Sequence, residues 1–290
     1  MDAKTIRVED YAVTEKPYYQ PVGNEVEIFE TAFKLRRPVA LIGPTGCGKT
    51  ALATYMAWYL GQDLTKGKGK AKKGVIFPYI EVPCHEDLTV NDLVGRYGFD
   101  GVWQPGPLYL GVQHGGIVAL DEIVEARKDA IVMLHALSDD RRHLSVTKKG
   151  EVLVPPEHFM LVVCYNPGYQ IRTKNLKPST RQRFVTIEMD YPPQPLETEI
   201  LMKKTGVEKD IAERFVQLGH NIREGARGKN ELNLQEGAST RLLIMACEFY
   251  ERQRKAGRKL NIEDIARVTI FNPVSTEETD RKTLEEMLKW

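Results

Sequence analysis

Residues Gly43-Pro44-Thr45-Gly46-Cys47-Gly48-Lys49-Thr50 fit the pattern G-x-x-x-x-G-K-[ST]. They follow the apolar run 38–42 and precede the helical stretch 51–60, which is the strand, loop and helix context of a phosphate-binding loop, or P-loop. The glycines allow successive backbone N–H groups to point at phosphate oxygens, and the dipole of the following helix adds positive potential there. We expect Lys49 to reach the β- and γ-phosphates and the Thr50 hydroxyl to ligate Mg²⁺.

Two carboxylates end a second apolar run. Residues 116–120 predict a buried strand, and Asp121 and Glu122 follow it directly. A carboxylate at the carboxyl end of this strand would lie beside the P-loop, where Asp121 can hold Mg²⁺. Glu122, one residue further, can polarise an attacking water. The alternative is that the pair only caps a helix.

Two polar residues downstream fit the same site. Asn166 follows the predicted strand 159–165, where its amide can hold a water against the γ-phosphate, although a lone Asn is also a common turn former. Arg241 opens a predicted helix at 239–256, and a cation there is unfavourable unless an anion is near. Phosphate contact and a surface salt bridge both remain possible for Arg241.

Two arginines precede the predicted strand 184–189. Arg181 and Arg183 are either surface charge or donors to the γ-phosphate in a neighbouring subunit, since such a donor needs a rigid fork that solvent can reach.

Composition bounds the class of protein. The chain has 290 residues, 42% hydrophobic and 28% charged, with a net charge of +1, which is typical of a soluble globular protein. This charge gives no global field that would recruit nucleic acid or an anionic membrane. No apolar run approaches the roughly 20 residues of a membrane span, and the N-terminus lacks a signal-peptide core, so a cytoplasmic location is expected. The four cysteines form no C-x-x-C pair, which favours reduced thiols.

The order of elements predicts an α/β fold. Five strands alternate with helices and predict a doubly wound parallel five-stranded sheet, within a nucleotide-binding domain over residues 1–193. Residues 192–195, Pro-Pro-Gln-Pro, break the chain, and a small all-helical lid domain is expected over 194–290. Its predicted helices are 196–205, 207–224, 239–256 and 262–271.

Four other segments stand out, and three of them have two interpretations each. The basic insertion 66–74 is either a solvated loop or a nucleic-acid contact. Residues 141–157 predict a hairpin insertion that turns at 148–150. The aromatic, glycine-rich stretch 96–107 predicts a loop that either packs internally or binds a polypeptide. Residues 84–87, Cys-His-Glu-Asp, are of types that bind metal ions. Consecutive side chains at a strand end point in different directions, however, which favours a structural role.

These residues in this order resemble the AAA+ ATPases: the P-loop as Walker A, Asp121-Glu122 as Walker B, Asn166 as sensor 1, Arg181 and Arg183 as arginine-finger candidates, and Arg241 as sensor 2. The closer details resemble the MoxR branch and, within it, the CbbQ/NirQ/NorQ group. The stretches that carry this resemblance are 18–25, 43–50, 84–89, 92–97, 120–129, 165–170 and 176–184.

The resemblance implies a function and partners. It implies a homohexamer with ATP and Mg²⁺ at subunit interfaces, where Arg181 or Arg183 reaches the adjacent site. It also implies nucleotide contacts from Val22, Gly23 and Ala51. Members of this group work with a CbbO-like adaptor that carries a von Willebrand factor A domain, and they activate a client enzyme by remodelling it. The expected client is rubisco, freed of inhibitory sugar phosphates; the alternative is nitric oxide reductase, whose maturation NorQ-like members assist.

Two rival hypotheses belong to other classes. A nucleic-acid-stimulated ATPase would use the basic residues 66–73 and would respond to polynucleotide in a salt-dependent way. A nucleotide-dependent scaffold would bind ATP and barely turn it over. Neither nucleic acid nor a membrane is expected as a partner.

Overall fold

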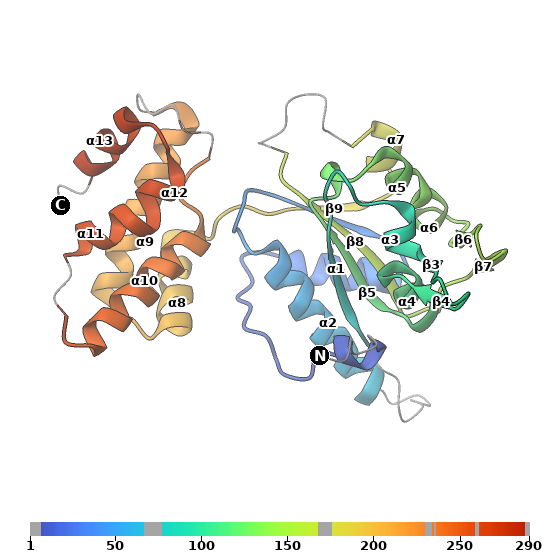
Figure 1. Ribbon diagram of the computed structural model, residues 1–290. Coiled ribbons are helices and arrows are strands. Elements are labelled where there is room, and N and C mark those ends of the chain that lie inside the picture. Colours follow the sequence, from blue (N-terminus) through green and yellow to red (C-terminus); the bar gives the residue numbers. More distant parts are fainter. Residues whose placement is uncertain are drawn as a thin grey trace. The chain divides into compact units, whose positions relative to one another are not determined.

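The computed structural model describes residues 7–66, 77–167, 176–229, 234, 236–258 and 261–287 (Figure 1). They form two compact units. The first comprises Met1–Ile42 and Lys49–Glu188, and the second comprises Gly43–Gly48 and Met189–Trp290. The basic insertion expected at 66–74 lies, beyond Lys66, outside the described residues. The domain boundary expected between residues 193 and 194 stays a prediction.

The first unit is built on a five-stranded sheet, which confirms the predicted fold class. All its neighbouring strands pair in parallel, in the order β2-β5-β8-β1-β9. The strands are β1 (Val39–Ile42), β2 (Tyr79–Pro83), β5 (Gly116–Asp121), β8 (Phe159–Tyr165) and β9 (Val185–Glu188). Every residue of β8 is buried, as expected for a central strand of a parallel sheet with both faces covered.

Helices cover both faces of this sheet (Figure 1). α2 contacts β5 and β8 and packs beside α1, whereas α4 contacts β2, β5 and β8 and packs beside α3. The helices are α1 (Glu25–Lys34), α2 (Lys49–Lys66), α3 (Val90–Val94), α4 (Pro107–His114), α5 (Lys128–Met133), α6 (His135–Ser138) and α7 (Pro178–Arg181), with short 3-10 turns η1 (Val8–Tyr11) and η2 (Ile123–Glu125). Among the described residues, no helix has the length and apolar character needed to span a bilayer.

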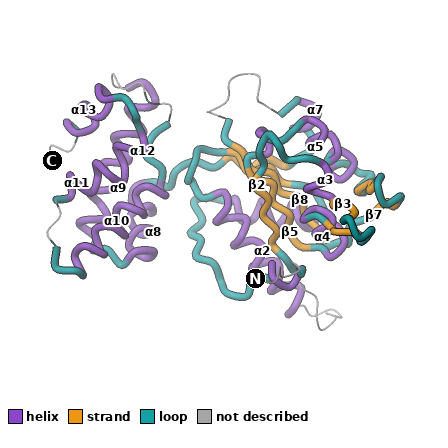
Figure 2. Tube along the Cα trace, in the orientation of Figure 1, coloured by secondary structure: helices purple, strands orange, loops and turns teal. Residues whose placement is uncertain are grey.

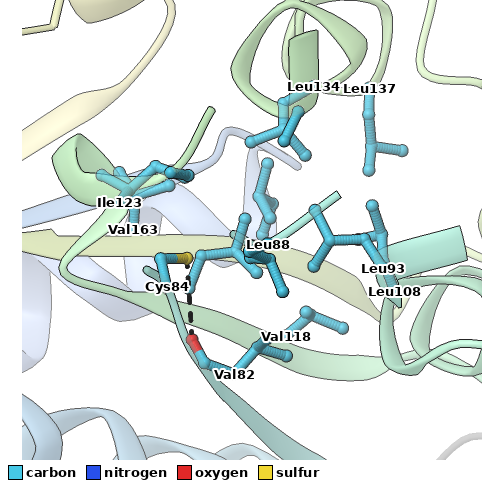
Figure 3. Packing of buried hydrophobic residues seen from close by; sticks show 14 of the residues in the cluster. Val82, Cys84, Leu88, Leu93, Leu108, Val118, Ile123, Leu134, Leu137 and Val163 are labelled. Atoms are coloured by element: carbon cyan, nitrogen blue, oxygen red, sulfur yellow. Dashed lines mark hydrogen bonds between the residues drawn. The ribbon is translucent and has the colours of Figure 1, made fainter. Parts of the chain in front are cut away.

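The core beneath the sheet joins its strands to the short helices. Val118 of β5 and Val163 of β8 pack in one cluster with Leu93 of α3 and Leu134 (Figure 3). Val118 and Leu120 face this cluster, and alternation along the strand turns Ile117 and Ala119 toward the opposite face. The central strands β5 and β8 are therefore buried on both faces, and the polar residues Asp121 and Asn166 come where these two strands end.

Two small hairpins project from the first unit. β3 (Gly95–Tyr97) pairs antiparallel with β4 (Trp103–Pro105), and β6 (Leu144–Val146) pairs antiparallel with β7 (Glu151–Leu153). The β3–β4 hairpin lies where the sequence predicted a loop, at 96–107. The glycine content of this stretch suggested a loop, but cross-strand pairing of Tyr97 with Trp103 orders it as a hairpin. The hairpins are joined by Lys149, whose Nζ lies 2.7 Å from the Tyr109 hydroxyl and 5.7 Å from the centre of the Trp103 ring.

The second unit is helical throughout its regular elements (Figure 2). Phe215, Leu243 and Phe271 are fully buried in its core. Its elements are α8 (Gln194–Thr205), α9 (Lys209–Glu224), the π-helical turn η3 (Gly225–Lys229), α10 (Thr240–Lys255), α11 (Ile262–Ala266), the π-helical turn η4 (Arg267–Phe271), α12 (Asn272–Val274) and α13 (Glu278–Glu286).

One buried ion pair ties three of these helical segments together. The Arg223 guanidinium on α9 donates two hydrogen bonds of 2.7 Å to the Glu197 carboxylate on α8, whose side chain is 0% exposed. Arg223 Nε donates to the Ala238 carbonyl at 2.7 Å, and the Thr240 hydroxyl of α10 donates to Glu197 at 2.6 Å. Since the polar atoms of both partners are engaged, the pair tolerates burial.

Replacing Arg223 by alanine would leave the Glu197 carboxylate buried without its counter-charge. We expect the free energy of unfolding to fall by about 3–5 kcal/mol, measured by urea denaturation. The matched control is Lys282→Ala, which breaks the exposed Lys282–Glu278 pair (3.0 Å) and should change stability by less than about 1 kcal/mol. Equal losses in the two variants would contradict the role given to the buried pair.

Candidate functional site

The candidate site lies at one edge of the sheet. β5, β8 and β1 are adjacent and parallel, with Leu120 in register with Val163 and Ile42 in register with Tyr165. Their carboxyl ends therefore open on the same edge, which is where open α/β sheets bind ligands. Asp121 ends β5, Asn166 follows β8, and the chain leaves β1 through the P-loop and enters α2 at Lys49.

Lys49 and Asn166 are held inside the protein at this edge. Their residues are 7% and 5% exposed, respectively, although each has a strongly polar side chain. Cys164 of β8 lies near the charged groups: burial raises the pKa of its thiol, the charge of Asp121 raises it further, and the charge of Lys49 opposes this. The ammonium and the carboxylate thus act on the same buried atom, as expected for groups that flank one strand end.

Glu122 has a strained backbone. Its φ is 50° and its ψ is 45°, the left-handed helical region, and its N–H donates to Asp121 Oδ1 at 3.2 Å. A non-glycine residue in this conformation costs on the order of 1–3 kcal/mol, and such strain concentrates at functional sites. The turn ends the strand at Asp121 and sets the direction in which the next carboxylate leaves the sheet.

The carboxylates make this edge electronegative. Burial and then the charges of Asp121 and Glu122 raise the pKa of the Cys84 thiol to about 12. Burial and then Asp121 also raise the pKa of Glu81 on β2. A divalent cation would relieve this accumulation of negative charge, and Thr50 and Asp121 offer the oxygen ligands that Mg²⁺ prefers beside waters and phosphates.

The described part of the chain holds no group of three or more His, Cys, Asp or Glu residues placed to bind a metal ion. Cys84 instead packs in the hydrophobic core, where its Sγ lies 3.8 Å from the Val82 carbonyl oxygen (Figure 3).

The P-loop has the backbone that its glycines allow. Gly46 and Gly48 have φ angles of 70° and 110°, values that L-residues rarely adopt. Within the second unit, the Thr45 N–H donates to Glu236 Oε1 at 2.7 Å, and the Tyr191 hydroxyl donates to the Thr45 carbonyl at 3.1 Å. Sequence reasoning missed Glu236 and Tyr191, since neither belongs to a spacing pattern with the P-loop.

Arg241 lies near the same loop. It is the second residue of α10, and a Cβ placed on Gly46 would come 3.1 Å from Arg241 Cβ and 2.8 Å from Ser239 Cβ. The Ser239 hydroxyl accepts from the Leu242 N–H and caps the helix. The helix start therefore lies against the P-loop, which places Arg241 in the neighbourhood where an anion would offset its unfavourable position.

The two arginine candidates differ in environment. Arg183 lies with its Nε 3.7 Å from Asp139 Oδ2, donates to the Ser179 carbonyl, and has a side chain 28% exposed. Arg181, at the end of α7, is exposed. Asp139 also accepts hydrogen bonds from the Arg141 side chain, and these lower the pKa of the Asp139 carboxyl to about 2.

The residues ahead of α1 are organised by a single carboxylate. Glu25 accepts from the Val22 N–H (2.8 Å), the Gly23 N–H (2.7 Å) and the Tyr19 hydroxyl (2.8 Å). Burial acts to raise the pKa of Glu25, but these hydrogen bonds together outweigh it and leave the pKa lowered. Sequence reasoning named Val22 and Gly23 but gave Glu25 no role.

Ala51 was also expected to contact the nucleotide. It is the third residue of α2 and follows Lys49 and Thr50 in the first turn of that helix.

Comparison with protein families gives two matches along the chain. The family described as "AAA domain (dynein-related subfamily)" matches residues 38–184, and the family "CbbQ/NirQ/NorQ C-terminal" matches residues 197–290. The first match contains the P-loop, Asp121, Asn166 and both arginine candidates. The second contains Arg241 and all helices from α9 onward.

Named relatives are similar over most of the chain. The denitrification regulatory protein NirQ of Pseudomonas aeruginosa is 44% identical over 89% of this chain and 91% of its own length. Protein NorQ of Paracoccus denitrificans is 42% identical over 91% of this chain and 92% of its own length. Protein CbbQ of Hydrogenophilus thermoluteolus is 44% identical over 81% of this chain and 82% of its own length.

Among solved structures, a RuvB variant from Thermotoga maritima has a TM-score of 0.57 and 18% sequence identity, and the alignment covers 93% of this chain and 78% of RuvB. This likeness supports the fold alone. The family matches and the relatives agree with the sequence resemblance, and they show that the chain is an ATPase. It belongs to the CbbQ/NirQ/NorQ family of AAA+ ATPases.

Proposed function

We propose that this ATPase is a remodelling motor that activates a client enzyme together with an adaptor carrying a von Willebrand factor A domain. The observation that carries the hydrolytic part is the placement of Asp121, Glu122 and Asn166 at the carboxyl ends of adjacent strands, with Lys49 at the start of the helix that follows β1. The remodelling part draws on the family, whose members act with partner proteins.

Each residue at this edge has a role in the proposal. Lys49 and the P-loop amides bind the phosphates, and Thr50 and Asp121 would hold Mg²⁺, which would supply positive charge beside them. Glu122 accepts a proton from the attacking water, and Asn166 orients that water by hydrogen bonding. Strain at Glu122 supports its role, because a left-handed conformation at a catalytic residue is kept only when the surroundings enforce it.

The proposal also includes a homohexamer in which subunits complete each other's sites. Arg181 and Arg183 are candidates for donating to the γ-phosphate bound by an adjacent subunit, and Arg241 for sensing the phosphate within its own chain. The exposure of Arg181 supports its availability to a neighbour, whereas Arg183 would first have to leave Asp139 and the Ser179 carbonyl.

The client is proposed to be rubisco, released from inhibitory sugar phosphates. Nitric oxide reductase is the second candidate, because relatives named NirQ and NorQ resemble the chain as closely as one named CbbQ does. For either client, the hairpin β3–β4 offers a contact, since Phe99 at its turn is fully exposed and Val102 is also exposed. Exposed aromatic side chains are typical of surfaces that bind polypeptides.

Glu122→Gln tests the hydrolytic assignment. The amide cannot accept a proton, so we expect kcat to fall by at least about 100-fold while ATP still binds. Phosphate release measures turnover, and retention of labelled ATP on the protein measures binding. Glu125→Gln, in the next turn, is the control and should keep its activity. An unchanged kcat in Glu122→Gln would remove this residue from the proposed mechanism.

Mixing of inactive variants tests whether an arginine acts in trans. Lys49→Ala subunits have a defective P-loop but intact arginines, whereas Arg181→Ala or Arg183→Ala subunits have the reverse. We expect ATPase activity to appear on mixing for the arginine that serves the neighbouring site, because mixed interfaces combine both intact parts. Each variant mixed with itself is the control. Mixtures that never exceed the separate proteins would argue against action in trans.

Reconstitution tests the client. With the co-expressed adaptor and ATP, we expect the full chain to restore activity to rubisco inhibited by sugar phosphates. Phe99→Ser should reduce this restoration by about tenfold, because the variant lacks an aromatic side chain that the proposed contact with the client would bury. Leu35→Ser removes an exposed apolar side chain elsewhere and should have no effect. Activation of nitric oxide reductase but not of rubisco would assign the second client, and activation of neither would contradict the proposal.

A further inference from the structure

The backbone of Thr45 in the P-loop is hydrogen bonded at both its N–H and its carbonyl by residues that no motif identifies. Its N–H donates to Glu236 Oε1 at 2.7 Å, and its carbonyl accepts from the Tyr191 hydroxyl at 3.1 Å. Glu236 lies 191 residues and Tyr191 lies 146 residues further along the chain, and all three residues belong to the second unit. The two contacts differ in chemistry and so should differ in their effect on an incoming anion.

The Glu236 contact places a carboxylate on an anion-binding loop. A P-loop binds phosphate because its backbone N–H groups point inward at anionic oxygens. A carboxylate oxygen is an acceptor of the same kind, and its charge makes the hydrogen bond from the Thr45 N–H stronger than one to a neutral acceptor. A phosphate that enters beside this N–H must displace the carboxylate, or it must bind next to a like charge. Either event weakens nucleotide binding.

The Tyr191 contact has the opposite character, since it constrains the loop without adding charge. The Tyr191 ring lies under the Arg223 guanidinium, with 3.9 Å from Arg223 Cζ to the ring centre. Arg223 is itself fixed by Glu197 and by the Ala238 carbonyl. The hydroxyl therefore holds the Thr45 carbonyl against a rigid support, which keeps the loop in one conformation before any ligand arrives.

We propose that Glu236 and Tyr191 are two further residues that set the affinity of this ATPase for nucleotide, and that they act with opposite sign. Glu236 is an internal competitor that must leave the Thr45 N–H before phosphate is fully bound. Tyr191 is a positioning residue that keeps the loop in its binding conformation. This inference rests on the proposed binding of phosphates by the P-loop.

Equilibrium binding of a fluorescent ATP analogue to the full-length variants tests both roles. Glu236→Gln removes the charge and keeps the shape, and we expect its Kd to fall about three- to tenfold. Tyr191→Phe removes the hydroxyl and keeps the ring under Arg223, and we expect its Kd to rise about three- to tenfold. General damage to the fold would shift both values in the same direction, so opposite shifts identify the roles.

Matched controls and a second probe sharpen the test. Glu213→Gln on α9 and Tyr250→Phe on α10 make the same chemical changes elsewhere in the second unit and should leave Kd unchanged. Tripolyphosphate is used to displace the fluorescent analogue. Its affinity should increase in Glu236→Gln by the same factor as the affinity of ATP, because Glu236 competes with phosphate groups for the Thr45 N–H. Glu236→Ala removes the acceptor altogether and should also lower Kd.

The outcomes separate this inference from the function on which it rests. If Lys49→Ala loses binding while both glutamate variants bind no more tightly than the unmodified protein, the competitor role of Glu236 is overturned. If Tyr191→Phe binds as tightly as the unmodified protein, the positioning role of Tyr191 is overturned. If Lys49→Ala itself binds ATP with unchanged Kd, the assignment of phosphate binding to the P-loop fails first.

Discussion

The register between β5, β8 and β1 is the constraint on which the candidate site depends. Pairing of Leu120 with Val163 and of Ile42 with Tyr165 sets where the carboxyl ends of the three strands, and with them Asp121 and Asn166, lie relative to one another. A slip of one residue would move a strand end by about 3.3 Å and would turn its side chains to the other face. Since β8 is buried along its whole length, packing on both faces resists such a slip, and one strand aligns both neighbours.

The sequence was informative wherever chemistry follows a local pattern. Apolar runs that end in polar residues predicted the central strands β5 and β8 and placed Asp121 and Asn166 at their carboxyl ends, because a strand buried on both faces reads as a continuous apolar run. Glycine spacing predicted the P-loop. The hairpin at residues 95–105 was missed, because pairing of Tyr97 with Trp103 depends on two short segments that carry no alternation long enough to detect.

Contacts between distant residues left no signal of this kind. Glu236 is one of 40 acidic residues and meets Thr45 only because the chain returns to the P-loop after 191 residues. Glu25 is similar: its position at the start of α1 looks like ordinary helix-dipole compensation, yet its carboxylate is engaged by the amides of Val22 and Gly23. In both cases a single sequence shows the charge but not the group that it meets.

The buried Glu197–Arg223 pair gives the second unit a rigid centre that supports both α10 and Tyr191. Burial of two charges is unfavourable unless every polar atom finds a partner, and here Ala238, Thr240 and the Tyr191 ring complete the environment. The same pair therefore fixes the start of α10, which carries Arg241, and the ring whose hydroxyl reaches Thr45. Stability of the helical core and the shape of the P-loop are thus served by one network.

Competition between phosphate and Glu236 for the Thr45 N–H would couple nucleotide binding to the Glu236–Thr45 hydrogen bond. If phosphate and Glu236 exclude each other, then any interaction that strengthens the Glu236–Thr45 bond weakens ATP binding, and ATP must by the same factor weaken that bond. Part of the free energy of phosphate binding then goes into releasing the Glu236 carboxylate rather than into affinity. This would be useful for the proposed motor, because a ligand shifts a conformational equilibrium only to the extent that it binds the two states differently. A carboxylate that leaves when phosphate arrives supplies such a difference at the first step of the cycle.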